Sequence, residues 1–545
     1  MVFGVTAAIM FAVVLWGALG TDSLSTASSA ALSWLLTNTG WGFVLAATAF
    51  VIFALFLAFS KYGRIPLGKD GEQPEFRTVS WIAMMFSAGM GIGLMFFGVS
   101  EPLSHFVSPP PGTVPGESEE AIKTAMATSL FHWTLHPWAI YAVAGLAIAY
   151  SAFRRGRSQT ISGVFLPLIG KRNAEGPIGK LIDILALFAT LFGSAASLGI
   201  GTLQIRAGMQ AAGWPIGEAG TGVLVAIIAV LTVCFIVSAV SGVAKGIQWL
   251  SNINMVLAAL LAVFVFVVGP TVFILDLLPT AVGSYISEFG EMASRAGATG
   301  GTEMQEWLAG WTVFYWAWWI SWTPFVGMFI ARISRGRTIR QFIGGVLLVP
   351  SVVSLVWFAI FGGAAIDSQK AGNPVYGDGS AEAQTFDVLA NLPLTLITSV
   401  LVMILVAIFF VSGADAASIV MGTLSQRGSI EPSRWVVIFW GAATGAVAAI
   451  MLVIGGGEDK ALEGIQNLTF IGALPFAIVM VLMCVALLKD LRSDPLTLRD
   501  AKGAEVLEQA VISGNEEHDG DFQLVTTPAE GNGEETATAL AGGKE

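Results

Sequence analysis

Long apolar segments separated by short polar breaks make up most of the chain. Each segment runs for 18 residues or more with few or no charges, which is the length that a helix needs to cross the hydrocarbon of a bilayer. The pattern predicts an all-α polytopic membrane protein with twelve transmembrane helices. The segments lie at about residues 2–20, 40–60, 80–102, 128–151, 182–210, 221–243, 250–276, 309–332, 340–362, 392–421, 435–455 and 467–488.

Composition and charge agree with this class and add an orientation. Of 545 residues, 55% are hydrophobic and only 12% are charged, and the mean hydropathy of +0.74 is far above that of a soluble domain. If the amino terminus is cytoplasmic, seventeen Lys and Arg residues lie in the inside loops and four in the outside loops. This bias predicts that both termini face the cytoplasm.

Two regions are expected to lie outside the bilayer. The loop at 277–308 follows the seventh span, and an amphipathic helix from Tyr285 to Ala296 is expected to lie on the membrane surface there. The segment 491–545 is acidic and rich in Gly, Thr and Ala, which predicts a mostly disordered cytoplasmic tail that an anionic leaflet repels. The chain therefore divides into a transmembrane domain, 1–490, and this tail.

The eighth span carries an uncharged aromatic stretch with four tryptophans in nine residues. At about 100° per residue, one helical stripe holds Phe314, Trp318, Trp322 and Phe325, and Trp319 lies beyond its edge, so several ring faces can converge. Membrane tryptophans are also common at lipid interfaces. Their clustering favours a site for a desolvated organic cation, which each ring face stabilises by about 0.5–2 kcal/mol. The stretch reads Phe314-Tyr315-Trp316-Ala317-Trp318-Trp319-Ile320-Ser321-Trp322.

The fourth span holds a second aromatic group. Trp133, Trp138 and Tyr141 spread over about 140° of helical arc, which is wide enough to wall one side of a cavity. Pro137 is expected to kink this helix. His132 and His136 sit four residues apart, but no cysteine or carboxylate near them in the sequence completes a zinc site. We expect hydrogen bonding from these histidines rather than metal binding.

The third and tenth spans contain further polar or helix-weakening positions. Three alternate glycines, from Gly89 to Gly93, favour an opened helix whose carbonyls face a cation and whose amides face an anion, although close helix packing also uses such glycines. In the tenth span, Ser412 can offer an oxygen to sodium or bond its own helix. Asp415 is either functional or caps a broken helix, because a carboxylate within a membrane span is costly.

These segments together resemble the betaine/choline/carnitine transporters over about residues 1–490, and most of all the sodium-coupled glycine betaine carriers of Gram-positive bacteria. The segments that carry the resemblance are 89–93, 131–141, 316–337 and 412–415. The resemblance implies a multi-pass transporter of the bacterial cytoplasmic membrane, not an enzyme, that forms a homotrimer among lipids. It also implies two amino-terminal helices at about 1–79, before two inverted five-helix repeats of the leucine-transporter type at about 80–276 and 309–488.

The resemblance also implies a substrate site. Aromatic walls would hold a trimethylammonium group, and the opened backbone of the third span, with one serine, would meet the substrate carboxylate. Carried over by position, these residues are Trp133, Trp138, Tyr141, Trp318, Trp319, Trp322, Ala88, Met90, Gly91 and Ser197.

Two sodium sites are implied in the same way, with no cofactor beyond the coupling ions. Gly413 departs from the sodium-coupled pattern, which has a second hydroxyl residue there. Met255 stands where the sodium-independent carnitine exchangers place an arginine, and Gly93 where proton-coupled choline carriers tend to place an aspartate. The first site would use Ser87, Met90, Phe409 and Ser412, and the second Thr190, Ser194 and Phe325.

The expected function is therefore secondary active import of a betaine-type compatible solute by sodium-coupled alternating access. Glycine betaine is the leading substrate, with ectoine and proline as further possibilities. The alternative is uptake or exchange of choline or carnitine with different ion coupling or none. An intramembrane hydrolase would need a nucleophile with its base or a metal set, and we find neither in the sequence. Partners are a small zwitterion or quaternary ammonium compound and membrane lipids, with no nucleic acid.

Overall fold

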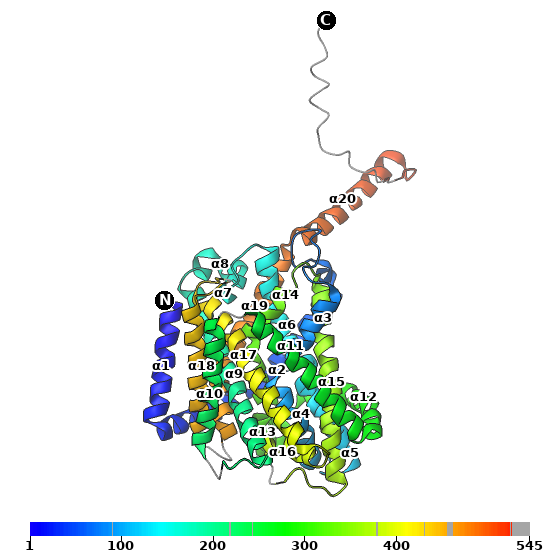
Figure 1. The fold of residues 1–545 in the computed structure, drawn as a ribbon. Helices are drawn as coiled ribbons and strands as arrows, with labels where there is room; N and C mark the ends of the chain where they lie inside the picture. The colour runs from blue at the N-terminus through cyan, green and yellow to red at the C-terminus, as the bar shows by residue number, and fades with distance from the viewer. Residues whose placement is uncertain are drawn as a thin grey trace. The chain divides into compact units, whose positions relative to one another are not determined.

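The fold is built of helices, as Figure 1 shows. The computed structural model describes residues 1–89, 91–216, 220–241, 244–377, 380–429, 431–454, 461–523 and 525. Across these ranges there is no β-strand, only an isolated bridge between Pro66 and Thr338. The all-helical class predicted from the apolar pattern is confirmed. Helices satisfy every backbone hydrogen bond within one segment, which a lipid environment requires.

The helices follow the predicted order of spans. Up to residue 268 the longer ones are α1 (Val2–Leu19), α2 (Thr21–Phe59), α3 (Thr78–Gly89), α4 (Ile92–Val107), α5 (Glu119–Trp133), α6 (Leu135–Ala149), α9 (Pro177–Ala211), α10 (Thr221–Ser241) and α11 (Ala244–Val268). After them come α12 (Thr271–Ser294), α13 (Gly297–Gly310), α14 (Thr312–Ile333), α15 (Ile339–Lys370), α16 (Ala381–Ala390), α17 (Thr395–Ser425), α18 (Arg434–Ile454) and α19 (Ala461–Arg492). Short helical segments are η1 (Lys61–Arg64), η2 (Tyr150–Arg154), α7 (Ile161–Val164) and α8 (Leu166–Ala174).

Helix α12 corrects the predicted boundary of the seventh span. Ten helices in the described ranges are long and apolar enough to cross a bilayer, and α12 is one of them although the sequence places 277–308 in an outside loop. The reason is Pro270, which follows the end of α11 at Val268, so the apolar residues from Thr271 onward start a new helix. The helix is therefore longer than the predicted 285–296 segment, and it packs against α5 and α15.

Two predicted spans are interrupted near their middle. In the third span α3 ends at Gly89 and α4 begins at Ile92, with Gly91 in an extended conformation, which agrees with an opened helix. In the fourth span the break between α5 and α6 falls at Thr134, three residues before Pro137, whose ring does not fit against the preceding helical turn. The tenth span differs, because α17 continues through Asp415, which excludes the alternative that this residue caps a broken helix.

The third helix of each predicted repeat lies at the centre of the packing. Helices α9 and α17 lie side by side, and α14 packs against both α6 and α9 (Figure 1). Helix α4 packs against α5 and α15. This places the opened third span, the aromatic fourth and eighth spans and the serine-bearing α17 around one region. The inverted relation between the two repeats and the trimer stay predictions.

Two loops that carry many of the basic residues expected inside are joined to each other. The backbone amide of Leu67 donates to the carbonyl of Arg337 (2.8 Å), and the amide of Gly336 donates to the carbonyl of Leu67 (2.9 Å). The guanidinium of Arg335 pairs with Glu72 at 2.7 Å. The loop before α3 and the loop between α14 and α15 therefore lie on the same side of the protein, as the charge pattern requires.

The carboxyl-terminal part forms a separate unit. The chain divides into two compact units, at residues 1–491 and 492–545. Helix α20 (Pro495–His518) lies where the sequence predicts disorder, and that expectation is wrong for these residues. Asp494 caps the helix by accepting from the amide of Leu496, and proline at the first helical position presets its backbone angle. Residues 526–545 lie outside the described residues, so the expectation of disorder there stays a prediction.

Candidate functional site

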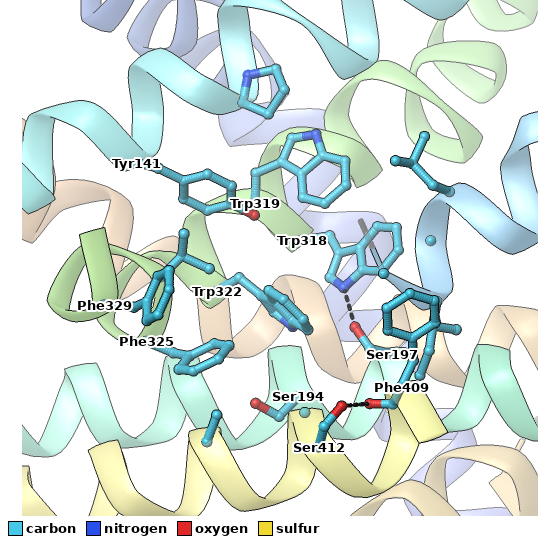
Figure 2. A pocket seen from close by; sticks show the side chains of 18 of the residues that line it. Tyr141, Ser194, Ser197, Trp318, Trp319, Trp322, Phe325, Phe329, Phe409 and Ser412 are labelled. Carbon is cyan, nitrogen blue, oxygen red and sulfur yellow. Dashed lines mark hydrogen bonds between the residues drawn. The ribbon is translucent and has the colours of Figure 1, made fainter. Parts of the chain in front are cut away.

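A cavity of about 280 Å³ lies among the interrupted and aromatic helices. Its lining comes from residues far apart in the sequence, and none of the described residues that line it is an Asp, Glu, Lys or Arg. Figure 2 shows Tyr141, Trp319 and Trp318 on one side of this space and Ser194 and Ser412 on another. The lining residues on the predicted substrate and sodium sets are Gly91, Trp133, Trp138, Tyr141, Ser194, Ser197, Trp318, Trp319, Trp322, Phe325, Phe409 and Ser412.

The aromatic side chains form walls that meet at an angle. The rings of Trp318 and Trp319 stack with centroids 4.7 Å apart and planes 15° from parallel. Trp133 stands nearly perpendicular to Trp319, at 4.9 Å and 78°. Tyr141 meets Trp319 at 6.3 Å and 76° (Figure 2). A positively charged group between these rings would face several π-surfaces at once.

The eighth span presents most of the stripe that helical spacing suggests, since Trp318, Trp322 and Phe325 line the cavity. Phe314, which belongs to that stripe, stacks on Trp318 at 5.8 Å, is buried, and is absent from the cavity lining. The neighbouring residues Trp318 and Trp319 line the cavity instead, together with Trp322. The ring size explains this, because indoles one residue apart can reach the same space from either side of a helix face.

Three of the indoles are held by hydrogen bonds to the protein. The Nε1–H of Trp318 donates to Ser197 Oγ (3.1 Å), and that of Trp319 donates to the carbonyl of His132 (3.1 Å). Trp133 Nε1–H donates to Glu101 Oε2 (2.6 Å). Because these N–H groups already have acceptors, the rings offer their faces and edges to the cavity. This orientation of the rings suits a ligand group that neither donates nor accepts hydrogen bonds.

Gly93 is required by the closeness of two of these rings. A Cβ atom at this position would lie 2.7 Å from Trp133 Cη2 and 2.9 Å from Trp318 Cη2, well inside van der Waals contact. Any side chain at residue 93 would therefore push the aromatic walls apart. This gives a physical reason for glycine at the position where proton-coupled choline carriers tend to place an aspartate.

The first turn of α4 faces the same cavity. Residues 91–94 all line it, and Gly91 is the N-cap of α4. The first amides of a helix have no acceptor within the helix, and the helix dipole favours an anion near them. Of the predicted backbone set, Met90 lies outside the described residues, and the side chain of Ala88 is among those that the structure does not describe. Ser197, the predicted serine, donates to the carbonyl of Gly193 (3.3 Å) while accepting from Trp318.

The predicted sodium residues lie partly on the cavity wall formed by α9 and α17. Ser412 Oγ donates to the carbonyl of Ile408 (2.8 Å) and lies 3.4 Å from that of Phe409, which leaves its lone pairs free for a cation (Figure 2). The hydroxyl of Ser194 is buried without a hydrogen-bond partner. A Cβ at Gly413 would meet no atom within 4 Å, so a hydroxyl residue fits there.

Of the remaining predicted sodium residues, Phe325 lines the cavity from α14, and Met90 lies outside the described residues. Thr190 lies one turn before Ser194 on α9, is buried, and donates to the carbonyl of Ala186 (2.9 Å), but it does not line the cavity. The side chain of Ser87 is among those that the structure does not describe. Asp415 is buried and is also absent from the cavity lining.

The sequence analysis missed Glu101, which contacts two of the aromatic residues. Its carboxylate is fully buried and bonds Trp133, Tyr315 (2.5 Å) and His132 (2.6 Å). His132 therefore has the carboxylate partner that the local sequence lacks, while His136 stacks on Trp316 instead (4.9 Å). A glutamate at the end of the apolar segment 80–102 was the available signal, because burying a carboxylate there needs partners.

Comparisons with known proteins identify similar transporters. A betaine/ectoine transporter of Corynebacterium glutamicum, LcoP, is 48% identical over 97% of this chain and 83% of its own length. The glycine betaine transporter OpuD of Bacillus subtilis is 45% identical over 93% of this chain and 97% of its own length. A glycine betaine transporter of Vibrio parahaemolyticus is 40% identical over 90% of this chain and 94% of its own length.

One solved structure and one family model also match. The structure is a substrate-bound, outward-open Na⁺-coupled sialic acid symporter, with 13% identity over 82% of this chain and 86% of that chain and a TM-score of 0.43. The model of the betaine/carnitine/choline family transporters, BCCT, matches residues 1–496. The match covers the cavity, the interrupted spans and the tryptophan segment alike. The chain belongs to the BCCT family and is an integral membrane transporter, not an enzyme.

Proposed function

We propose that the protein imports a betaine-type compatible solute, glycine betaine foremost, by sodium-coupled alternating access. The observation that carries the proposal is the set of ring faces at Trp133, Tyr141, Trp318 and Trp319 around an uncharged cavity. A quaternary ammonium group donates no hydrogen bond, so a protein recognises it mainly through ring quadrupoles. Relatives named as betaine or ectoine transporters support the same substrate class.

The uncharged lining favours a zwitterion over a simple cation. A zwitterion such as glycine betaine carries its own carboxylate, so the site needs no acidic residue to balance the ammonium group. The first turn of α4 provides unpaired amides and a favourable dipole for that carboxylate on the same cavity. Choline has no carboxylate and would leave these amides without an anion.

Sodium coupling is proposed from the hydroxyl groups on the opposite wall. Ser194, which has no partner, and Ser412, whose lone pairs are free, offer oxygen ligands from α9 and α17. Two sodium ions, each driven by about 2.3 kcal/mol at 100 mV and about 1.4 kcal/mol per tenfold gradient, supply roughly 7 kcal/mol. That supports accumulation on the order of 10⁵-fold, whereas one ion supports roughly a few hundred-fold.

Uptake into proteoliposomes tests the proposal directly. Purified protein is reconstituted, and entry of radiolabelled glycine betaine is measured under an inward sodium gradient with an inside-negative potential. We expect accumulation that disappears when potassium replaces sodium. Flux that is retained in potassium would exclude obligatory sodium coupling, and no flux in either salt would exclude the substrate. Competition by unlabelled ectoine, proline, choline and carnitine then ranks the head groups.

The aromatic walls themselves are tested by substitution. Trp133→Leu and Trp319→Leu each remove one ring face that contributes about 0.5–2 kcal/mol, so we expect the apparent affinity to fall by roughly 2- to 30-fold each. Trp435→Leu is the control, because that tryptophan is 79% exposed at the start of α18 and distant in sequence from every lining residue. Normal uptake in both cavity variants would refute the proposal that the aromatic walls bind the substrate.

A further inference from the structure

A buried carboxylate lies directly behind the aromatic walls. Glu101 projects from α4 with no exposed surface. Its oxygen Oε2 accepts hydrogen bonds from Trp133 Nε1 (2.6 Å) and from the hydroxyl of Tyr315 (2.5 Å), and its Oε1 lies 2.6 Å from His132 Nδ1. Burying such a group costs several kcal/mol unless it is fully bonded, so its place beside the cavity calls for a physical reason.

The contacts of this carboxylate fit its ionised form. An indole N–H can only donate, so Oε2 must accept from Trp133, and the same oxygen also takes the tyrosine hydroxyl. Distances of 2.5–2.6 Å are those of charge-assisted hydrogen bonds. A neutral imidazole satisfies the third contact, because His132 can donate from Nδ1 and accept at Nε2 from the hydroxyl of Thr312 (2.9 Å).

No basic side chain other than histidine balances this charge among the described residues. His105 Nε2 lies 3.6 Å from Glu101 Oε1. The next cation, Arg295, lies over Trp307 (5.6 Å) and pairs with Glu291 (3.6 Å) rather than with Glu101. Among the described residues an ionised Glu101 would therefore have no direct ion pair with lysine or arginine, and its field would extend toward the cavity.

A shared metal ion is a weaker account of the same cluster. Ligand atoms of Glu101, His105 and His132 all lie within 4.8 Å of one another. However, Glu101 Oε1 and His132 Nδ1 are 2.6 Å apart, whereas two ligands on one tetrahedral zinc ion lie about 3.3 Å apart. The pair is in direct hydrogen-bond contact and leaves no room for an ion between the two atoms.

The two donors connect the charge to the substrate site. Trp133 lines the cavity with the ring whose N–H bonds Glu101. Tyr315 does not line the cavity, but its ring stacks against Trp318 (6.3 Å, 27°) and Trp319 (5.8 Å, 17°), which both do. The carboxylate is thus one ring from the cavity through Trp133, and two rings from it through Tyr315 and the stacked tryptophans. An acceptor at an indole N–H also pushes electron density onto the ring face that a cation meets.

We propose that Glu101 is a specificity-determining residue: its buried charge behind Trp133 and Tyr315 makes the cavity prefer a cationic head group over an uncharged one of the same shape. The inference rests on the proposed function, since it concerns the head group bound by the same walls. Glu101 does not touch substrate. It acts through the two rings, and its field favours a positive charge and opposes a negative one.

The test compares two probes of equal shape. Glycine betaine and 3,3-dimethylbutanoate differ only in the nitrogen or carbon at the centre of the head group, so both keep the carboxylate and the three methyl groups. Dissociation constants for both are measured by tryptophan fluorescence on purified full-length protein, for the wild type, Glu101→Gln and the control Glu303→Gln, which removes an exposed carboxylate on α13. The readout is the ratio of the two constants, which a general loss of packing would not change.

We expect Glu101→Gln to reduce the preference for glycine betaine over the carbon isostere by about tenfold or more, and Glu303→Gln to leave it unchanged. A ratio within twofold of the wild type in Glu101→Gln would overturn the inference, even if both affinities fell. If Glu101→Gln does not fold, Tyr315→Phe decides, because it keeps the ring and removes one path to the carboxylate. It should lower the ratio about threefold, and an unchanged ratio would overturn the inference. Wild-type protein that binds neither probe would refute the proposed function and this inference together.

Discussion

Replacing Gly93 with alanine should push two aromatic walls apart, because it adds a methyl group that meets the rings of both. The added carbon would lie 2.7 Å from the Trp133 ring and 2.9 Å from the Trp318 ring, whereas carbon atoms pack at about 3.5–4.0 Å. Each ring must therefore withdraw by roughly 1 Å. Neither ring is free to do so, because Trp133 is bonded to Glu101 and Trp318 to Ser197.

The cost of this change follows from the packing. Inserting a methyl group into a close-packed site costs about 1–3 kcal/mol, and 1.4 kcal/mol is a factor of ten in affinity. We therefore expect the dissociation constant for glycine betaine to rise by about 5- to 150-fold. Alanine is a better helix former than glycine by about 1 kcal/mol, so the thermal unfolding temperature should change less than the affinity does.

The assay is a tryptophan fluorescence titration in detergent, followed by uptake in proteoliposomes. The matched control is Gly344→Ala on α15, where a Cβ would meet no atom within 4 Å. The control should bind and transport like the wild type. If Gly93→Ala binds glycine betaine within twofold of the control, the two rings do not define the binding volume, and the reasoning from their closeness is refuted.

Three other perturbations give separate predictions. Gly413→Ser should lower the sodium concentration for half-maximal uptake by several-fold, because a hydroxyl fits there; an unchanged sodium dependence would count against the first sodium site. The pKa of Glu72 is held below its usual value by the backbone amide of Lys69 and by Arg335. The contribution of Glu72 to folding stability is therefore present near neutral pH and is lost as the pH falls through the pKa in the folded state. Glu72→Gln should therefore lower thermal stability at pH 7, by less than about 1 kcal/mol because the pair is partly exposed, with no difference at low pH, and equal curves at pH 7 would contradict this. Deleting the residues after 495 should leave a weak response to external osmolality unchanged in uptake assays, and strong activation that vanishes on deletion would oppose it.

The sequence predicts the helical class and most of the aromatic lining for physical reasons. Twenty-residue apolar segments have few stable forms in lipid, and tryptophans clustered in a charge-free segment are rare enough to mark a site. Trp133, Trp138, Tyr141, Trp318 and Trp319 all line one cavity. The sequence signals there are local, because helical spacing alone brings neighbouring rings together.

Other features depend on contacts between distant segments. The bond from Tyr315 to Glu101 joins residues 214 positions apart, and no local pattern reveals it. The start of α12 depends on whether Pro270 interrupts the helix, because the residues on both sides of it are apolar and would otherwise form one continuous span. Likewise, the absence of Phe314 from the lining depends on which face of α14 meets α9, which only the packing decides.

The indole N–H groups of Trp133, Trp318 and Trp319 already donate to protein acceptors, and this also affects the thermodynamics of ligand binding and release. With those donors satisfied inside the protein, these three rings give water little to bond, and the unpartnered side-chain donors on the cavity, among the described residues, are Trp322 Nε1 and the hydroxyls of Tyr141 and Ser194. Binding in a poorly hydrated apolar space tends to be driven by enthalpy and to show a negative heat-capacity change. Titration calorimetry at several temperatures should reveal that signature. It would explain how the site binds its substrate tightly and still releases it quickly.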